Sequence, residues 1–370
     1  MPECREKDGK LLGLELLRVL AAFAVLVWHY QHFAFDGVSI VVQRDAQPFY
    51  GLLHPFYDYG WYGVQVFWSI SGFIFFRRYG ESVAAGTVSA WRFFVLRFSR
   101  LYPLHLVTLL LVALLQYAHI TQLGHYFVYR HNDVYHFLLQ LFLASHWGLQ
   151  DGYSFNGPIW SISVEVLVYL VFYVSLLLCK RALPPILTGV ALAIGLREAG
   201  LENAVTDCIG FFFAGGMGAL LMKNFSANPA AGIVRPLAWA ITIAAPVLAV
   251  LFARAPSANA VIYSLTAYAP FVLYCFAQPL RMRQDIGKLV EVAGNLTYGS
   301  YLLHFPLQLA IAWYFKSSGM TIPMYDGSLF VFYIGMSFGA AFIGYRLFEA
   351  PAQAFLRRNL IPQTARPSRV

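Results

Sequence analysis

The sequence predicts an all-α membrane protein, a polytopic helix bundle with about ten transmembrane helices and both termini in the cytoplasm. Of its 370 residues, 59% are hydrophobic and only 12% are charged, and the mean hydropathy is +0.59. A soluble domain usually carries about 25% charged residues, and it cannot bury this much apolar surface. The apolar runs have the length of a lipid-spanning helix, whereas membrane strands would alternate in shorter segments.

Ten apolar runs predict the individual transmembrane helices. The first follows basic residues but is too long for the apolar region of a signal peptide, so we expect a retained helix. The fifth is the shortest and begins beside two prolines. The ten predicted spans are 11–33, 61–76, 101–118, 158–179, 183–197, 204–222, 233–253, 258–278, 289–315 and 328–348.

Basic residues support this count, because cytoplasmic loops are enriched in Lys and Arg. With the N-terminus inside, 19 of the 26 Lys and Arg residues lie in inner segments, 5 in outer segments and 2, Arg18 and Arg346, within spans. Residues 1–10 and 359–370 are therefore expected to be cytoplasmic, and 11–358 to form the membrane domain. The same asymmetry explains the net charge of +8, so we expect no nucleic-acid partner.

Two long outer loops, about 34–60 and 119–157, are rich in aromatic residues and histidine, which suit the lipid interface. Within the second loop, Val134–Trp147 predicts an amphipathic helix that lies on the outer surface. The loop histidines His125, His131 and His136 lack a clear fourth ligand, so we expect no metal site. The four scattered cysteines show no paired or metal-binding spacing and are interpreted as apolar fillers.

Charged residues inside the first helix indicate a functional site, because a charge in the membrane interior costs roughly 2.5–3.5 kcal/mol. Arg18 and His29 lie on nearly the same face, about 16 Å apart along the helix axis. Glu15 is expected to pair with Arg18 one turn away. The structural alternative is one Glu–Arg pair and one interfacial histidine. Arg346 and Glu349, at positions i and i+3, are interpreted as a second structural pair.

Five arginines are predicted near one cytoplasmic mouth, at the inner ends of the first three spans. Guanidinium groups match phosphate oxygens, which favours an anionic, phosphate-bearing ligand. The alternative is the ordinary excess of basic residues on the inner side. The five are Arg18, Arg77, Arg78, Arg97 and Arg100.

Two further polar residues lie within predicted spans. Glu165 is expected at about the depth of His29, where a carboxylate fixes the tautomer that a general base needs. The alternative is a hydrogen bond from Tyr169, one turn along the same helix. His304 lies near the middle of the ninth span, where a lone histidine is more often a structural hydrogen-bonder.

Six motifs occur in one order along the chain, and each of them is weak when taken alone. They are LELLRVLAAFAVLVWHY with Arg18 and His29, YGVQVFWSISGFIFF with a Ser-Gly-Phe core, RFSRLYPLHL, NGPIWSISVEVLVYL, YGSYLLHFPL and YRLFEAPAQAFLRR. Together the motifs cover about residues 11–358. Because they occur in this order, the chain resembles the acyltransferase family 3 membrane proteins. That family includes O-acetyltransferases and O-succinyltransferases of bacterial surface polysaccharides. Gln65 stands where many members have an acidic residue, and Glu15 where many have Asp.

The resemblance implies transfer of a short acyl group from cytoplasmic acyl-CoA to a hydroxyl of a cell-surface or lipid-linked glycan at the bacterial inner membrane. Among short acyl groups, acetyl is the one we expect. Acyl-CoA is implied as a co-substrate, with its phosphates on the five arginines, and no bound cofactor is expected. His29 is implied as the general base, oriented by Glu165. Substrate contacts are expected at Ser71, Trp160, Ser161, Tyr301 and His304. Where acceptor transfer needs an extracytoplasmic transferase, we expect a separate protein to supply it.

Two alternatives stay open on sequence grounds. One is an acyltransferase that acts on a small molecule or a lipid. The other is a transporter of an anionic or acylated solute, because charged residues inside a membrane also mark substrate pathways. No motif in the second half of the chain mirrors those of the first half, which disfavours the inverted repeats that are typical of transporters.

Overall fold

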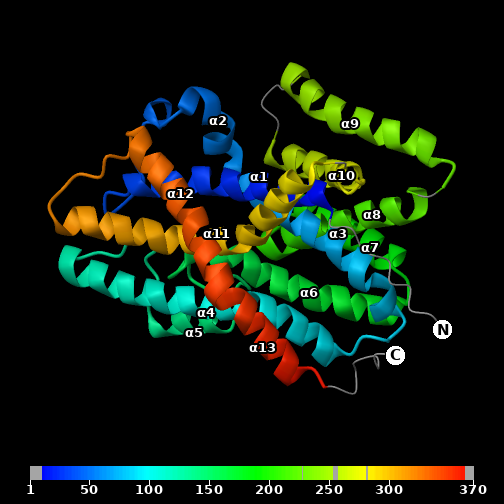
Figure 1. Ribbon diagram of the computed structural model, residues 1–370, viewed down its shortest axis with the longest axis horizontal. Coiled ribbons are helices and arrows are strands. Elements are labelled where there is room, and N and C mark those ends of the chain that lie inside the picture. The colour runs from blue at the N-terminus through cyan, green and yellow to red at the C-terminus, as the bar shows by residue number, and fades with distance from the viewer. Residues whose placement is uncertain (1–10, 227, 253–256, 281, 363–370) are drawn as a thin grey trace. The chain divides into compact units, whose positions relative to one another are not determined.

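The structure is a computed structural model that describes residues 11–226, 228–252, 257–280 and 282–362 (Figure 1). All of its named elements are helical, as predicted, and Phe35 and Ile40 form an isolated β-bridge. The predicted cytoplasmic segment 1–10 and positions 363–370 of the predicted tail lie outside the described residues. The described chain forms two compact units. Unit 1 holds residues 11–20, 65–85 and 174–294, and unit 2 holds residues 21–64, 86–173 and 295–362.

Each of the ten predicted spans overlaps one helix of the described chain over most of its length. These helices are α1 (Leu12–His29), α3 (Gly63–Ala84), α4 (Ala90–Leu123), α6 (Trp160–Cys179), α7 (Leu183–Glu198), α8 (Ala204–Phe225), α9 (Ala231–Phe252), α10 (Ala258–Phe276), α11 (Gln284–Ser317) and α12 (Gly327–Gly344). In the described part of the chain, all but α3, α7 and α11 are long and apolar enough to cross a membrane, which gives seven candidate spans. The count of ten and the location of the termini stay predictions.

Shorter elements fill the connections. They are η1 (Tyr30–Ala34), η2 (Arg44–Ala46), α2 (Tyr50–Tyr59), η3 (Gly60–Tyr62), α5 (Val134–Leu141), η4 (Gly157–Ile159), the π-helical turn η5 (Tyr345–Glu349) and α13 (Ala350–Leu360). The predicted amphipathic helix begins where expected, because Asp133 caps α5 by accepting a hydrogen bond from the His136 backbone N–H. It ends well before Trp147, since Leu143 adopts a left-handed backbone with φ of 55°.

Helix α4 begins earlier than predicted. Ser89 caps it by accepting a hydrogen bond from the backbone N–H of Arg92. Pro103, close to the predicted start at 101, lies inside the helix instead. Arg97 and Arg100 therefore lie two to three turns into the helix rather than at its beginning.

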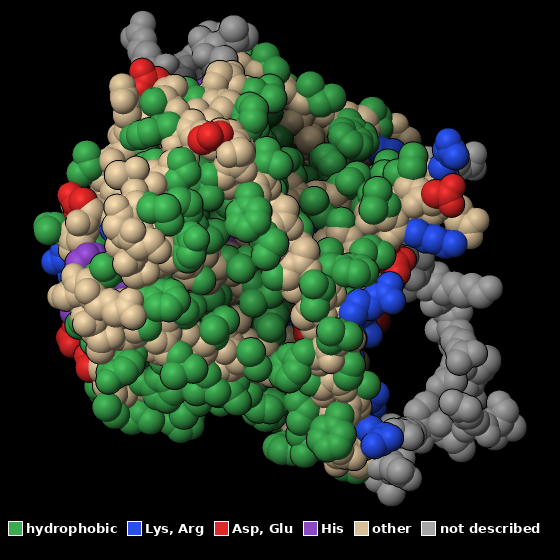
Figure 2. Space-filling model, turned by 60° about the vertical axis from the view of Figure 1, so that its left-hand side comes forward, with side chains coloured by type: hydrophobic (Ala, Val, Ile, Leu, Met, Phe, Trp, Pro, Cys, Tyr) green, Lys and Arg blue, Asp and Glu red, His purple; other side chains and the backbone are tan. Residues whose placement is uncertain are grey.

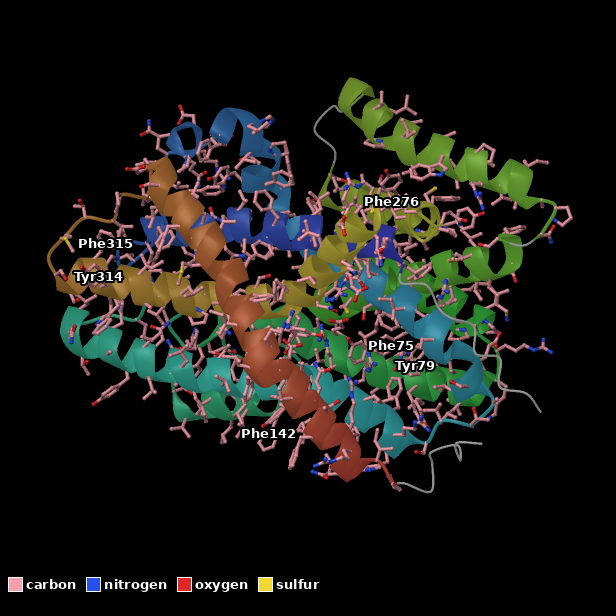
Figure 3. The ribbon with its side chains drawn as sticks, in the orientation of Figure 1. Phe75, Tyr79, Phe142, Phe276, Tyr314 and Phe315 are labelled. Atoms are coloured by element: carbon pink, nitrogen blue, oxygen red, sulfur yellow. The ribbon has the colours of Figure 1, made fainter. Side chains whose placement is uncertain are left out.

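Unit 1 is built on close contact between helices. Gly72 of α3 lies against the backbone of Phe212 in α8, and Gly215 of α8 lies against the backbone of Ser69 in α3. Such small residues let helix backbones approach closely. One turn along α3, Phe75 and Tyr79 form an edge-to-face pair with ring centroids 5.8 Å apart (Figure 3). Helix α8 also packs against α7 and α10, and α10 packs against α9.

Unit 2 has two buried aromatic clusters. One surrounds Tyr30, the first residue of η1, and includes Tyr333 of α12. The other contains Phe127 and Phe155 of the segment between α4 and α6 together with Phe305 of α11. In Figure 1, α12, η5 and α13 continue as one rod, and α13 packs against α4.

The surface carries many large hydrophobic side chains, as expected for helices in lipid. In the view of Figure 2, hydrophobic side chains cover much of the face that is seen. Phe142 and Tyr314, labelled in Figure 3, expose 71% and 59% of their surface. The apolar surface and the apolar helices together indicate a membrane protein.

Candidate functional site

Three buried imidazoles lie in ring contact within unit 2. The His29 ring centroid lies 4.7 Å from that of His304 and 5.0 Å from that of His32. His29 ends α1, His32 lies in the adjoining η1, and His304 lies in α11. Each side chain is buried. We call these three residues the histidine cluster.

Hydrogen bonds set the tautomers of two of these rings. His29 Nδ1 lies 2.9 Å from the Val25 carbonyl oxygen, and His304 Nδ1 lies 2.6 Å from the Tyr301 carbonyl oxygen. A carbonyl only accepts, so each Nδ1 carries a proton, and in the neutral ring each Nε2 carries a lone pair. No described residue hydrogen-bonds to Nε2 of His29, and Nε2 of His304 is fully buried without a partner in the described chain. The Nε2 atoms of both rings are therefore left without a hydrogen-bond partner among the described residues.

Gln308 joins the histidine cluster to α11. Its side-chain amide Nε2 donates to the His29 backbone oxygen at 2.8 Å, and its Oε1 accepts from His32 Nδ1 at 3.3 Å. Gln308 is itself fully buried. The amide therefore fixes the end of α1 and the orientation of the His32 ring at once.

The beginning of α6 is tied to α11 by a second set of polar contacts. Tyr301 Oη donates to the Pro158 carbonyl at 2.7 Å and therefore accepts from Ser161 Oγ, which also lies at 2.7 Å. Asn156 Nδ2 donates to the Leu302 carbonyl at 3.0 Å. The Asn156 Oδ1 atom is buried without a partner in the described residues. Two predicted substrate-contacting residues, Tyr301 and Ser161, are thus in contact with each other.

The side chain of Trp160 contacts the loop segment between α4 and α6. Its ring lies 5.4 Å from that of His146 and 6.4 Å from that of Tyr153. Burial lowers the pKa of His146 below its ordinary value and raises the pKa of Tyr153 above its own. Both side chains are therefore neutral at physiological pH, and the surroundings of Trp160 carry no charge from them.

Glu165 accepts a hydrogen bond from Tyr169 Oη at 2.7 Å, which is the structural alternative raised by the sequence. The group that holds Nδ1 of His29 is the Val25 carbonyl rather than a carboxylate. Tyr169 also lines an apolar cavity of about 330 Å³ between α4 and α6, together with Arg97. The catalytic role of Glu165 stays a prediction.

The predicted arginines are divided between the two units. In unit 1, Arg18 pairs with Glu15 at 3.0 Å, as predicted. Arg77 and Arg78 are exposed on α3, where Arg77 contacts the Met222 sulfur. Ser71 is half-buried on the same helix, beside Gly72. The roles of these residues towards a phosphate or a substrate stay predictions.

In unit 2, Arg100 forms an ion pair of 2.6 Å with Glu349, whose side chain is buried. This corrects the predicted pairing of Glu349 with Arg346, which instead lies over the Phe342 ring at 5.3 Å. The π-helical turn Tyr345–Glu349 explains the difference, since its wider winding turns position i+3 away from the face that an α-helix would give it. Arg100 therefore has a structural partner, and its predicted role at a phosphate is untested.

Sequence reasoning missed three polar residues that the structure places here: His32, Gln308 and Asn156. Helical spacing offered a signal for two of them. His32 follows His29 by three residues, and Gln308 follows His304 by four, so each shares a face with a predicted site residue. Asn156 begins a recognised motif, but nothing local predicts its bond to α11.

A family model matches most of the chain, and one relative matches part of it. The acyltransferase domain model of acyltransferase family 3 matches residues 11–346. The chain is also similar to "Protein 2 in picA locus" of Rhizobium radiobacter, with 37% identity over 83 residues. That match spans 21% of this chain and 42% of the relative, so it covers less than half of either. No solved structure matches.

Proposed function

Because the chain belongs to acyltransferase family 3, we propose that this membrane acyltransferase moves a short acyl group, acetyl first, from cytoplasmic acyl-CoA to a hydroxyl of a cell-surface or lipid-linked glycan. The family match supports the reaction class. Donor, acyl group, acceptor and the bacterial inner membrane as its location belong to the proposal.

One observation carries the mechanism: the buried rings of His29 and His304 lie in contact, and each has its Nδ1 bonded to a backbone carbonyl and its Nε2 without a partner in the described chain. A general base needs a lone pair, a fixed tautomer and a position next to the acceptor hydroxyl. His29 meets the first two conditions through its bond to Val25. His304 offers a second buried acceptor atom that a hydroxyl would satisfy. A hydroxyl between these rings would supply the missing donor.

The proposed reaction is direct acyl transfer. His29 Nε2 takes the proton of the acceptor hydroxyl as its oxygen attacks the thioester carbonyl. The new C–O bond forms, the C–S bond breaks, and the departing sulfur takes the proton back from His29. Ser161 and Tyr301, already hydrogen-bonded to each other, are proposed to contact the acceptor, with Trp160 at the outer loop.

The donor half of the proposal rests on the arginines. CoA carries phosphates, and Arg18 is the arginine nearest to the middle of a predicted span. Arg18→Ala is expected to weaken acyl-CoA binding, whereas Glu15→Gln, which removes its partner but keeps the guanidinium, is expected to retain binding. Unchanged acyl-CoA affinity in Arg18→Ala would reject the phosphate role.

The decisive experiment tests His29 in cells and in vitro. His29→Ala is expected to lower acyl transfer about 10²–10⁴-fold, the usual contribution of a general base. His54→Ala, at an exposed histidine of α2, is the matched control and should keep full activity. Size-exclusion profiles in detergent would verify that both variants fold. Near-wild-type transfer by His29→Ala would overturn the assignment.

The acceptor is identified by mass spectrometry of envelope glycans from cells with and without the protein. A difference of one acyl group on a glycan supports the proposal and names the group transferred. The same difference on a small molecule or a lipid would replace the proposed acceptor. Uptake of a labelled solute without any acyl transfer would overturn the enzymatic proposal itself.

A further inference from the structure

A histidine and carboxylate cluster lies in the loop segment between α4 and α6, apart from the histidine cluster and within unit 2. His131, His136 and Asp151 each offer a ligand atom, and these atoms all lie within 4.8 Å of one another. We propose that His131, His136 and Asp151 bind one Zn²⁺ ion. The histidine spacing alone led us to expect no metal site, because Asp151 follows His136 by 15 residues and forms no motif with it.

His136 is the fixed ligand of this site. Its side chain is buried, and its Nδ1 lies 2.8 Å from Asp133 Oδ2. Its Nε2 accepts a hydrogen bond from the Asp151 backbone N–H at 3.2 Å. Nδ1 therefore carries the proton, and the Nε2 lone pair points towards Asp151. A carboxylate that holds the far nitrogen of a metal-binding histidine is the usual supporting contact of such a ligand.

The two other ligands are free to adjust. Asp151 exposes 76% of its side chain, and its Oδ2 lies 3.9 Å from His136 Nε2. The His131 ring lies over Gly152, where any side chain would meet it, and 5.1 Å from the His136 ring. Zn²⁺ bonds of about 2.0–2.1 Å put tetrahedral ligand atoms about 3.3 Å apart, so small movements of His131 and Asp151 close the site.

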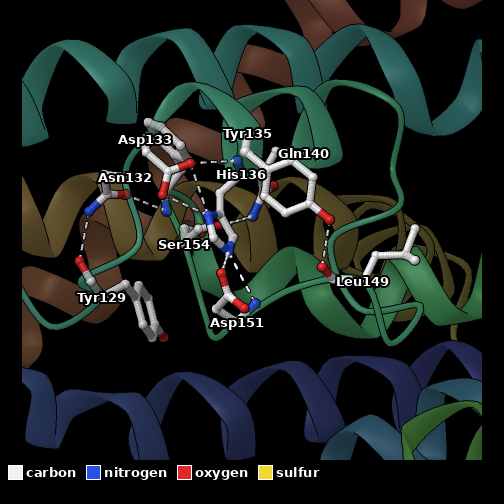
Figure 4. Close-up of polar contacts among 10 residues, drawn as sticks. Tyr129, Asn132, Asp133, Tyr135, His136, Gln140, Leu149, Asp151 and Ser154 are labelled. Carbon is white, nitrogen blue, oxygen red and sulfur yellow. Dashed lines mark hydrogen bonds and ion pairs between the residues drawn. The ribbon is translucent and has the colours of Figure 1, made fainter.

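Hydrogen bonds already join the two chain segments that carry the proposed ligands. The Asn132 side chain accepts from the Phe155 backbone N–H at 2.7 Å, and Gln140 donates to the Ser154 carbonyl at 2.8 Å. Tyr135 Oη donates to the Leu149 carbonyl at 2.7 Å (Figure 4). These bonds hold residues 132–140 against 149–155, so metal binding needs little further ordering of the backbone.

The donor set selects the type of metal. Two imidazole nitrogens and one carboxylate suit Zn²⁺ and disfavour Mg²⁺ and Ca²⁺, which prefer oxygen ligands. Three protein ligands leave the fourth tetrahedral position to water. The bound ion would replace the weak hydrogen bond between Asp151 and His136 and would clamp the loop that leads into Asn156 and α6.

The test measures Zn²⁺ binding to the full-length protein in detergent, purified without a histidine tag and stripped with a chelator. Competition with a fluorescent zinc indicator should give one Zn²⁺ per chain. His131→Ala and Asp151→Asn should each lower the affinity at least about tenfold. His54→Ala and Asp45→Asn change exposed residues outside the cluster and should bind as the wild type does.

A second variant separates binding from folding. Asp133→Asn keeps the cap of α5, because Asn caps a helix as well as Asp does. It removes only the carboxylate behind His136, so Zn²⁺ affinity should fall about 10–100-fold with the melting curve of the metal-free protein unchanged. Wild-type protein without saturable Zn²⁺ binding would overturn the proposal and leave a hydrogen-bonded cluster only. Equal affinities in His131→Ala, Asp151→Asn and wild type would overturn it as well.

Discussion

Replacing Gly72 by Ala should destabilise unit 1, because α3 and α8 touch backbone to backbone at this residue. A Cβ atom on Gly72 would lie 1.8 Å from the Phe212 carbonyl oxygen and 2.6 Å from its carbon. Real Cβ atoms do not approach closer than 3.0 Å, so the helices must part by 1.2 Å or more. The obstacle is backbone and cannot rotate away.

The free-energy change follows from two opposing effects. Overpacking of a tight contact costs about 1–3 kcal/mol, and an obstacle that is backbone puts this contact in the upper part of that range, about 2–3 kcal/mol. The better helix propensity of Ala offsets up to about 1 kcal/mol of this loss. A net loss of roughly 1–2 kcal/mol is therefore expected, and Gly215→Ala should show a similar loss, since its Cβ would lie 1.9 Å from the Ser69 oxygen.

The assay is unfolding of the purified protein in detergent, followed by intrinsic fluorescence. Gly335→Ala on α12 is the matched control, because a Cβ there meets nothing within 4 Å. It should leave the unfolding midpoint unchanged or raise it. If Gly72→Ala unfolds at the same midpoint as Gly335→Ala, the close-packing argument is wrong, and the Ser-Gly-Phe motif needs a functional explanation for its glycine.

Two further predictions concern the candidate site. Gln308→Leu should lower the free energy of unfolding by about 1–3 kcal/mol, because it removes the side-chain donor to the His29 carbonyl and leaves the buried His32 Nδ1–H without its acceptor; an unchanged unfolding midpoint would contradict this. Glu165→Gln should lower kcat by removing the charge while keeping an acceptor for Tyr169, whereas Tyr169→Phe keeps the carboxylate and should leave kcat unchanged. Equal effects of Glu165→Gln and Tyr169→Phe on kcat would assign Glu165 a structural role.

Much of the helical fold was predictable, because an apolar run of about 20 residues crosses lipid as an α-helix. The predicted start of the fourth span at 158 lies within two residues of Trp160, the first residue of α6. The start of α4 was not predictable in the same way. Its first eleven residues include Arg92, Arg97 and Arg100, and such a basic stretch resembles a cytoplasmic loop even where a helix continues through it.

The candidate site was predictable one residue at a time but not as a set. A histidine inside a span draws attention through the energy of burying it, which is a local property. Its partners are set by packing between segments far apart in sequence. Gln308 reaches His29, and Asp151 reaches His136, only once the helices and loops have been placed. No periodicity within one segment carries that information.

The π-helical turn at Tyr345–Glu349 has a consequence for how the end of the chain is aligned. A turn of this kind contains one residue more than an α-helical turn, so it offsets everything after it by about 100° around the helix axis. That offset aims Glu349 at Arg100 and Arg357 at Ser99, both on α4. The single extra residue thus sets the rotation of α13 about its own axis. The contacts with α4 are kept only while the number of residues between Gly344 and Ala350 is unchanged.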